Sequence, residues 1–215
     1  ALQIINRLIE FDPLNYAAIF EKGLIQGKDL LKTYWKNMSD VENNYLEIAT
    51  QYMNAGLYEE GISLLSSLRD PDSPLVCFYL AWLYGKADQE PLAMDMLRTA
   101  EKKSTDYCFP YREETEKILK YALKLDPGLT TASYLLGNLL FDHRKADAVD
   151  AWEKAARTDP DLSMVWRNLA FAAFYYENDV DKAIDLLERA LEGDRSQPLW
   201  YAELARYYDA SDRDF

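Results

Sequence analysis

The stretch SYLLGNLLFDHRKADAVDAWEKAARTDP, residues 133–160, decides the fold class of this 215-residue chain. It contains two amphipathic segments separated by a short polar turn, and it ends in an Asp-Pro pair that stops the second segment. Two of its positions return 35 residues later, where Ala183 and Leu187 repeat Ala148 and Trp152. Such a repeat predicts a series of helical hairpins that bury their apolar faces against one another.

A second repeat lies in the N-terminal half, with a step of 32 residues that takes Ala49 and Leu65 to Ala81 and Leu97. Almost all of the eight prolines fall at joints between the predicted helices, and inside a helix each would cost roughly 3 kcal/mol. No stretch shows the sustained polar–apolar alternation that a half-buried strand requires. The sequence therefore predicts an all-α chain of about twelve or thirteen short antiparallel helices.

Several helix boundaries follow from individual residues. Gly56 predicts the end of one helix, and Tyr58 predicts the start of the next. Ser73 followed by Pro74 is typical of an N-cap and a first helical residue. The motif Ser39–Glu42 has the spacing of a capping box, which predicts that a helix begins directly after Ser39.

Charge and residue counts exclude several classes of function. The chain has 24 Lys and Arg against 37 Asp and Glu, a net charge of −13, whereas nucleic acids and anionic membranes attract basic proteins. One histidine and two cysteines are too few for histidine-rich zinc sites or catalytic imidazole pairs. We therefore predict no catalytic residue, no cofactor, no metal site, and no nucleic-acid or membrane partner. The N-terminus lacks a signal-peptide pattern, so we expect a cytoplasmic protein.

The repeated pattern resembles the tetratricopeptide repeat (TPR). In the stretch quoted above, the match is carried by Leu136-Gly137, Leu140, Ala148, Trp152, Ala155 and Pro160. The resemblance implies a single α-α superhelix, a TPR solenoid, over residues 1–215. We expect repeats at approximately 40–71, 73–104, 129–160 and 162–195, a partial repeat at 197–215, and irregular helices at 1–38 and 106–127. The irregular segments are expected near 13–38 and 101–127, with a break in register near Asp106–Pro110.

A narrower resemblance begins at YCFPYREE (107–114) and continues through SYLLGNLLFD (133–142), DAWEKA (150–155) and VWRNLA (165–170). These stretches are similar to large bacterial TPR proteins whose repeats follow a conserved N-terminal domain of unknown function. The resemblance implies that the chain is a fragment, the C-terminal repeat region of a longer protein. Two interpretations remain: a non-catalytic protein–protein interaction scaffold, or an accessory or structural arm of a larger bacterial enzyme, for example a carbohydrate-active one.

In TPR proteins the first helix of each hairpin lines the concave face of the superhelix. Carried over by position, the resemblance implies an aromatic groove lined by Phe78, Trp82, Tyr134, Asn138, Phe141, Arg167, Phe171, Phe174 and Tyr175. Aromatic side chains offer a large contact area, which suits a binding surface. We expect a protein or peptide partner there, including another domain of the same parent chain, with self-association as a further option. The alternative for each residue is a role in core packing.

The resemblance also allows a specific ligand to be considered. Asn138 and Asn168 match two asparagines with which some TPR domains hold the terminal carboxylate of a chaperone. Tyr134, Leu199 and Glu203 stand where that clamp has Lys or Arg. A carboxylate clamp is therefore not expected.

The loop Phe109–Arg112 has two interpretations. We expect a linker whose Phe109 and Tyr111 side chains fill the break in register. The alternative is a docking loop that presents these side chains to a partner.

Overall fold

The computed structural model describes residues 1–27, 31, 34, 38–39, 41–68 and 71–211. The helices whose bounds are described are twelve α-helices and one π-helix, and no β-strand occurs in these ranges. The predicted all-α class and helical-repeat architecture are thus confirmed. The chain divides into two compact units, Ala1–Met96 and Leu97–Phe215.

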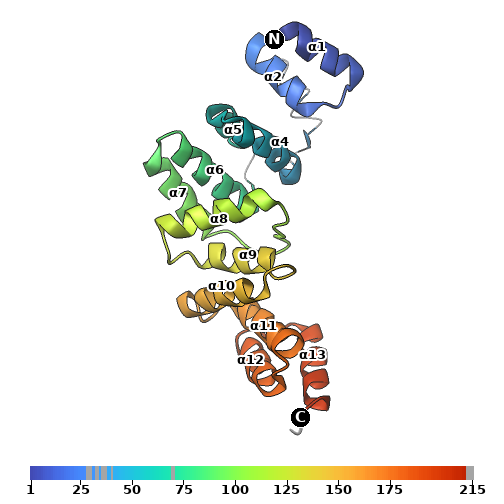
Figure 1. Cartoon of the computed structure of the whole chain (residues 1–215), viewed down its shortest axis with the longest axis vertical. Coiled ribbons are helices and arrows are strands. Elements are labelled where there is room, and N and C mark those ends of the chain that lie inside the picture. The colour runs from blue at the N-terminus through green and yellow to red at the C-terminus, as the bar shows by residue number, and fades with distance from the viewer. Residues whose placement is uncertain (28–30, 32–33, 35–37, 40, 69–70, 212–215) are drawn as a thin grey trace. The chain divides into compact units, whose positions relative to one another are not determined.

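The N-terminal unit contains paired helices (Figure 1). They are α1 (Leu2–Phe11), α2 (Tyr16–Gln26), α4 (Glu42–Ala55), α5 (Tyr58–Leu65) and α6 (Pro74–Lys86), while α7 (Glu90–Ala100) crosses the boundary between the units. α1 packs on α2, and α5 packs on both α4 and α6. α2 lies in the predicted irregular segment 13–38, of which residues 28–30, 32–33 and 35–37 fall outside the described ranges.

Two of the boundaries predicted in this unit are confirmed. α4 ends at Ala55, and Gly56 follows it with a φ of +74°, the left-handed conformation that glycine adopts without strain. α5 then begins at Tyr58. At the start of α6, the Ser73 side chain accepts the backbone N–H of Leu75 at 3.1 Å, as expected of an N-cap residue.

The predicted capping box at Ser39–Glu42 is wrong. α4 begins at Glu42, so this glutamate is the first helical residue and not the third. Its Oε1 instead accepts the backbone N–H of Ser73 at 3.0 Å. Glu42 therefore connects the start of α4 to the start of α6, the first helix of the following hairpin.

The helices of the C-terminal unit follow one another in chain order, each packed on the previous one (Figure 1). They are α8 (Glu113–Leu125), α9 (Thr130–Leu140), α10 (Lys145–Thr158), α11 (Ser163–Ala172), the π-helix η1 (Ala173–Glu177), α12 (Val180–Gly193) and α13 (Pro198–Asp209). Residues 101–112 form no helix, in agreement with the irregular segment expected there. The hairpins are α9 with α10 and α11 with α12, and α13 packs on α12 as the next first helix.

The close approach of Gly137 on α9 to Trp152 on α10 explains the small and bulky positions of the motif. A Cβ placed on Gly137 would lie 2.3 Å from Cδ1 of the Trp152 ring, which no real Cβ tolerates. Glycine therefore lets the two helices of the hairpin come together around the indole ring. The repeat spacing reflects this packing requirement.

Four helices end in the same Asp-based turn. The carboxylates of Asp12, Asp126, Asp159 and Asp194 accept backbone N–H groups two residues further on at 2.9–3.0 Å, those of Leu14, Gly128, Asp161 and Ser196. Each aspartate follows the last residue of α1, α8, α10 or α12. These helices thus share the boundary that marks the second helix of a hairpin.

Candidate interaction face of the C-terminal unit

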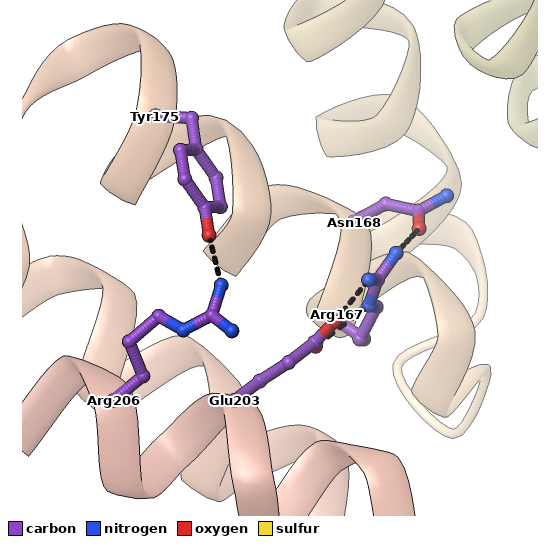
Figure 2. Close-up of polar contacts among 5 residues, drawn as sticks. All are labelled: Arg167, Asn168, Tyr175, Glu203 and Arg206. Atoms are coloured by element: carbon purple, nitrogen blue, oxygen red, sulfur yellow. Dashed lines mark hydrogen bonds and ion pairs between the residues drawn. The ribbon is translucent and has the colours of Figure 1, made fainter.

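A chain of polar side chains connects the first helices α9, α11 and α13. Asn138 Oδ1 accepts hydrogen bonds from Trp152 Nε1 and from Asn168 Nδ2, each at 3.0 Å. Arg167 Nη1 donates to Asn168 Oδ1 at 3.5 Å, and Arg167 Nε donates to Glu203 Oε2 at 2.9 Å. Arg167 Nη2 also pairs with Glu203 Oε1, so the guanidinium holds both carboxylate oxygens and lies between Asn168 and Glu203 (Figure 2).

A row of aromatic rings runs beside these polar groups. The Phe141 and Phe171 rings meet edge to face with centroids 5.9 Å apart, and Phe171 and Tyr175 follow at 4.5 Å. Arg167 Cζ lies 5.2 Å from the centre of the Phe171 ring. We define the polar–aromatic face as nine residues. Four are polar residues of the chain just described, namely Asn138, Arg167, Asn168 and Glu203, and three are the rings of Phe141, Phe171 and Tyr175. The last two are Tyr134, which hydrogen-bonds the Asn138 side chain, and Arg206, which contacts Tyr175.

The π-helix η1 carries Tyr175 of this face. It continues α11 directly and ends at Glu177, and the next residue, Asn178, has a φ of +57°. Tyr175 is 48% exposed, and its hydroxyl accepts a hydrogen bond from Arg206 Nη1 at 2.8 Å (Figure 2). A single turn of π-helix is rare in proteins, and the turns that do occur are often found at functional sites. The adjacent Asp179 caps α12 by accepting the N–H of Lys182 at 3.0 Å, so the wide turn is fixed on its C-terminal side.

Burial and pairing set the protonation states on the face. Burial raises the pKa of Tyr134, while its hydrogen bond with the Asn138 side chain acts in the opposite direction. For Arg167, burial alone would lower the pKa, but the hydrogen bonds and charge of Glu203 outweigh it and raise the pKa above its ordinary value. Arg167 therefore stays charged at physiological pH.

Tyr207 lies beneath the face. Its ring stacks on Phe174 with centroids 4.2 Å apart, and only 1% of its surface is exposed. Its hydroxyl is buried and has no hydrogen-bond partner among the described residues. Burial first, and then the charge of Glu203, raises the pKa of Tyr207 to about 12, so the hydroxyl keeps its proton and is available as a donor.

The structure brings together six of the nine predicted groove residues: Tyr134, Asn138, Phe141, Arg167, Phe171 and Tyr175. Phe174 is half-buried and contacts Tyr207 and Tyr175, which places it at the base of the face. Tyr134 is 7% exposed, as buried as Trp82, so it also corresponds to the core-packing alternative, whereas Asn138 on α9 and Phe141 at its C-cap are partly exposed.

Phe78 and Trp82 belong to the N-terminal unit and are packed side chains there. Phe78 is fully buried because α6 is buried on all sides from Pro74 to Leu83. Trp82 is 7% exposed and packs edge to face on Tyr58 at 5.8 Å. Both are core residues in this structure, which corresponds to the core-packing alternative.

Two members of the face, Asn168 and Glu203, were considered only as clamp positions and not as groove residues. Glu203, which stands where the clamp would have a basic residue, pairs with Arg167 of the preceding first helix. The two residues are 36 positions apart, close to one repeat step. A basic and an acidic residue one repeat apart on successive first helices form the sequence pattern that would have predicted this pair.

The loop before α8 presents its aromatic side chains outward. Tyr107, Phe109 and Tyr111 are exposed, while Cys108 between the first two is buried. The expectation that Phe109 and Tyr111 fill the break in register is therefore wrong. Tyr111 is covered on one side only, by the Arg112 guanidinium 4.4 Å from its ring centre.

The described part of the chain holds neither a metal-binding cluster nor a membrane-spanning helix. No group of three or more His, Cys, Asp or Glu side chains is arranged there to hold a metal ion. No helix in the same residues is long and apolar enough to cross a bilayer.

No protein-family model matches the chain, and no curated protein matches it in sequence. Among solved structures, MamA of AMB-1 is 20% identical over 81% of this chain and 83% of its own, with a TM-score of 0.43. MamA of Desulfovibrio magneticus RS-1 is 18% identical over 85% and 95%, with a TM-score of 0.40. YrrB, a TPR protein with an unusual peptide-binding site, is 14% identical over 94% and 98%, with a TM-score of 0.42.

The fold is a TPR-like helical repeat. The assignment rests on the helices, the hairpin contacts and the motif positions of this chain, above all Gly137 against Trp152. At the identities and TM-scores just given, the solved structures carry no information about a ligand or partner.

Proposed function

We propose that the chain is a non-catalytic protein-interaction scaffold whose C-terminal unit binds a peptide segment or a domain through the polar–aromatic face. The observation that carries the proposal is the joining of three first helices into one surface. α9, α11 and α13 are separated in sequence by the second helices, yet Asn138, Asn168, Arg167 and Glu203 form one connected set of contacts.

The accessibility of the face supports a binding role. Asn138, Arg167, Asn168 and Phe171 are each partly exposed, and their contacts with one another fix their positions. A ligand therefore meets side chains that are already ordered, which lowers the entropic cost of association. Amide and guanidinium groups orient the ligand, and the rings of Phe141, Phe171 and Tyr175 provide apolar area. The partner is a separate protein or another domain of the parent chain.

Two neighbouring tyrosines allow a matched test. Tyr175 contacts Phe171 and Arg206 on the face and is 48% exposed, whereas Tyr176 is 43% exposed and lines a separate open pocket with Ala146 and Val149 of α10. Binding of an array of short peptides is measured with the wild-type chain and with Tyr175→Ala and Tyr176→Ala, each checked for folding by circular dichroism. We expect the wild-type chain and Tyr176→Ala to bind the same peptides, and Tyr175→Ala to bind them no longer.

Two results would contradict the face as a binding site. One is that the wild-type chain retains no peptide, and the other is that both variants lose the same peptides equally. Either result would favour the second interpretation, an accessory or structural arm of a larger enzyme. That interpretation is then tested by adding the chain to its parent enzyme and measuring turnover.

A further inference from the structure

Three cations accompany the aromatic row of the polar–aromatic face, although the chain as a whole is acidic. The whole chain has 24 Lys and Arg against 37 Asp and Glu. On the face, each ring of the aromatic row has a cation beside it. Lys145 Nζ is 5.9 Å from the Phe141 ring centre, Arg167 lies over Phe171, and Arg206 donates to the Tyr175 hydroxyl.

Acidic residues also neighbour the face, among them Asp142 next to Phe141 and Glu177 two residues after Tyr175. Glu203 pairs with Arg167, and Asp106 acts electrostatically on Tyr134 at the α9 end. Within the described residues, neither Lys145 nor Arg206 forms an ion pair, and both side chains are exposed. Two cations on the face are therefore available to a ligand, in a protein whose overall charge would repel an acidic one.

The third cation of the face, Arg167, is already paired with Glu203. Arg167 holds both carboxylate oxygens of Glu203, and the side chains are 26% and 24% exposed, so a solvent-borne carboxylate has access to the same guanidinium. Tyr207 lies four residues after Glu203, one turn further along α13, and its hydroxyl is buried and without a partner among the described residues. A buried donor without a partner is destabilising, so a carboxylate that turns toward it gains a hydrogen bond.

We propose that the polar–aromatic face binds an acidic segment of a partner protein, and that Glu203 controls this binding by exchanging between Arg167 and Tyr207. The inference rests on the proposed function of the same face. Ligand carboxylates pair with Lys145 and Arg206, and an apolar ligand side chain packs on Phe171 and Tyr175. When a further ligand carboxylate takes the Arg167 guanidinium, Glu203 turns to the Tyr207 hydroxyl.

The test uses three sets of short peptides that share their apolar residues and differ only at the polar positions, which are acidic, neutral or basic. Fluorescence anisotropy measures the affinity of the full chain for each set at low and at high salt. One exposed ion pair changes affinity by up to about fivefold, so we expect the acidic set to bind about tenfold more tightly than the neutral set at low salt. High salt should remove most of that difference.

Variants of the chain separate the two parts of the inference. The double variant Lys145→Gln with Arg206→Gln should lose the preference for acidic peptides. Lys124→Gln with Lys154→Gln, at exposed lysines of α8 and α10, removes the same two charges and serves as the control. Glu203→Gln should raise affinity for the acidic set severalfold, because it releases Arg167 and removes a repelling charge. Tyr207→Phe should lower that affinity without lowering the free energy of unfolding, an outcome that a merely structural role of the hydroxyl would not produce.

The possible failures are distinguishable. If the neutral set binds as tightly as the acidic set and Tyr175→Ala still abolishes both, the face binds ligands and the acidic preference is wrong. If affinity for acidic peptides is unchanged in Glu203→Gln and in Tyr207→Phe, the exchange is wrong. If no set binds, the proposed function fails together with the inference.

Discussion

Asn138 on α9 and Asn168 on α11 join two successive hairpins by an amide hydrogen bond of 3.0 Å. The same Asn138 oxygen accepts the indole N–H of Trp152 at 3.0 Å, so one side chain fixes both the partner helix of its own hairpin and the next first helix. The ring of Trp152 in turn packs against Gly137, one residue before Asn138. The packing of the hairpin and the position of the polar–aromatic face are thus set by neighbouring residues.

Asn138→Ala should therefore destabilise the C-terminal unit by about 1–3 kcal/mol, because it leaves the buried indole N–H of Trp152 without its acceptor. Asn168→Ala is the matched control, since it removes the bond between hairpins and leaves the Trp152 bond in place. Urea unfolding followed by tryptophan fluorescence measures both. An equal loss in the two variants would show that the bond between the hairpins, and not the indole bond, carries the effect.

Gly137→Ala should also destabilise the chain. The new methyl group would meet Trp152 ring atoms at 2.3–2.9 Å, and overpacking of this kind costs about 1–3 kcal/mol, against a gain in helix propensity of about 1 kcal/mol. In the exposed turn, the Cβ of Gly128→Ala would meet only Asp126 Oδ1, at 3.2 Å. Thermal unfolding should separate the two, and a Gly137→Ala variant as stable as Gly128→Ala would mean that the Trp152 ring moves aside without cost.

The hairpins were predictable because their packing depends on residue size at fixed spacing. Ala148, Trp152 and Ala155 are all buried, as a repeated small–bulky–small pattern implies. The turn after each second helix was equally readable, since Asp159 before Pro160 places a carboxylate where it accepts a backbone N–H. These features are local or periodic, so they can be recognised in the sequence without knowledge of the rest of the fold.

The candidate site was only partly predictable. A first-helix position indicates a face of the helix, but it does not say whether another helix covers that face. Phe78 was assigned to the groove, yet α6 has no charged residue between Pro74 and Gly85, a sign that its whole circumference is buried. The pair of Arg167 and Glu203 depends on a separation of 36 residues, and no pattern in the sequence indicated the π-helix at Tyr175.

Ser73→Ala should lower the stability of the N-terminal unit by about 1 kcal/mol, because the Ser73 hydroxyl oxygen is the acceptor for Leu75 N–H at the start of α6. Ser63→Ala, at an exposed position within α5, is the control and should be neutral or slightly stabilising, since alanine has the higher helix propensity. Circular dichroism during thermal unfolding measures both. Indistinguishable melting curves would mean that the Ser73 cap contributes nothing.

Glu116 on α8 gives the chain a defined response to acid. Hydrogen bonds from Arg144, at 2.5 Å, and from Lys120, at 2.7 Å, lower the pKa of Glu116 below its ordinary value of 4.5. The native state therefore favours the charged form. Its contribution to stability is fully present above pH 4.5 and is lost as the pH falls through the lowered pKa.

Glu116→Gln should consequently reduce the free energy of unfolding by up to about 1 kcal/mol at neutral pH, the range of partly exposed ion pairs, and should flatten its decrease below pH 4.5. Glu113→Gln, in the exposed first turn of the same helix, controls for the loss of one negative charge. Urea unfolding at a series of pH values measures both variants beside the wild-type chain. Because the bond to Arg144 ties α8 to the start of α10 across the first helix α9, the loss should appear in the cooperative unfolding of the whole C-terminal unit. If the free energy of unfolding of Glu116→Gln falls below pH 4.5 as steeply as that of the wild-type chain, other carboxylates cause the pH response.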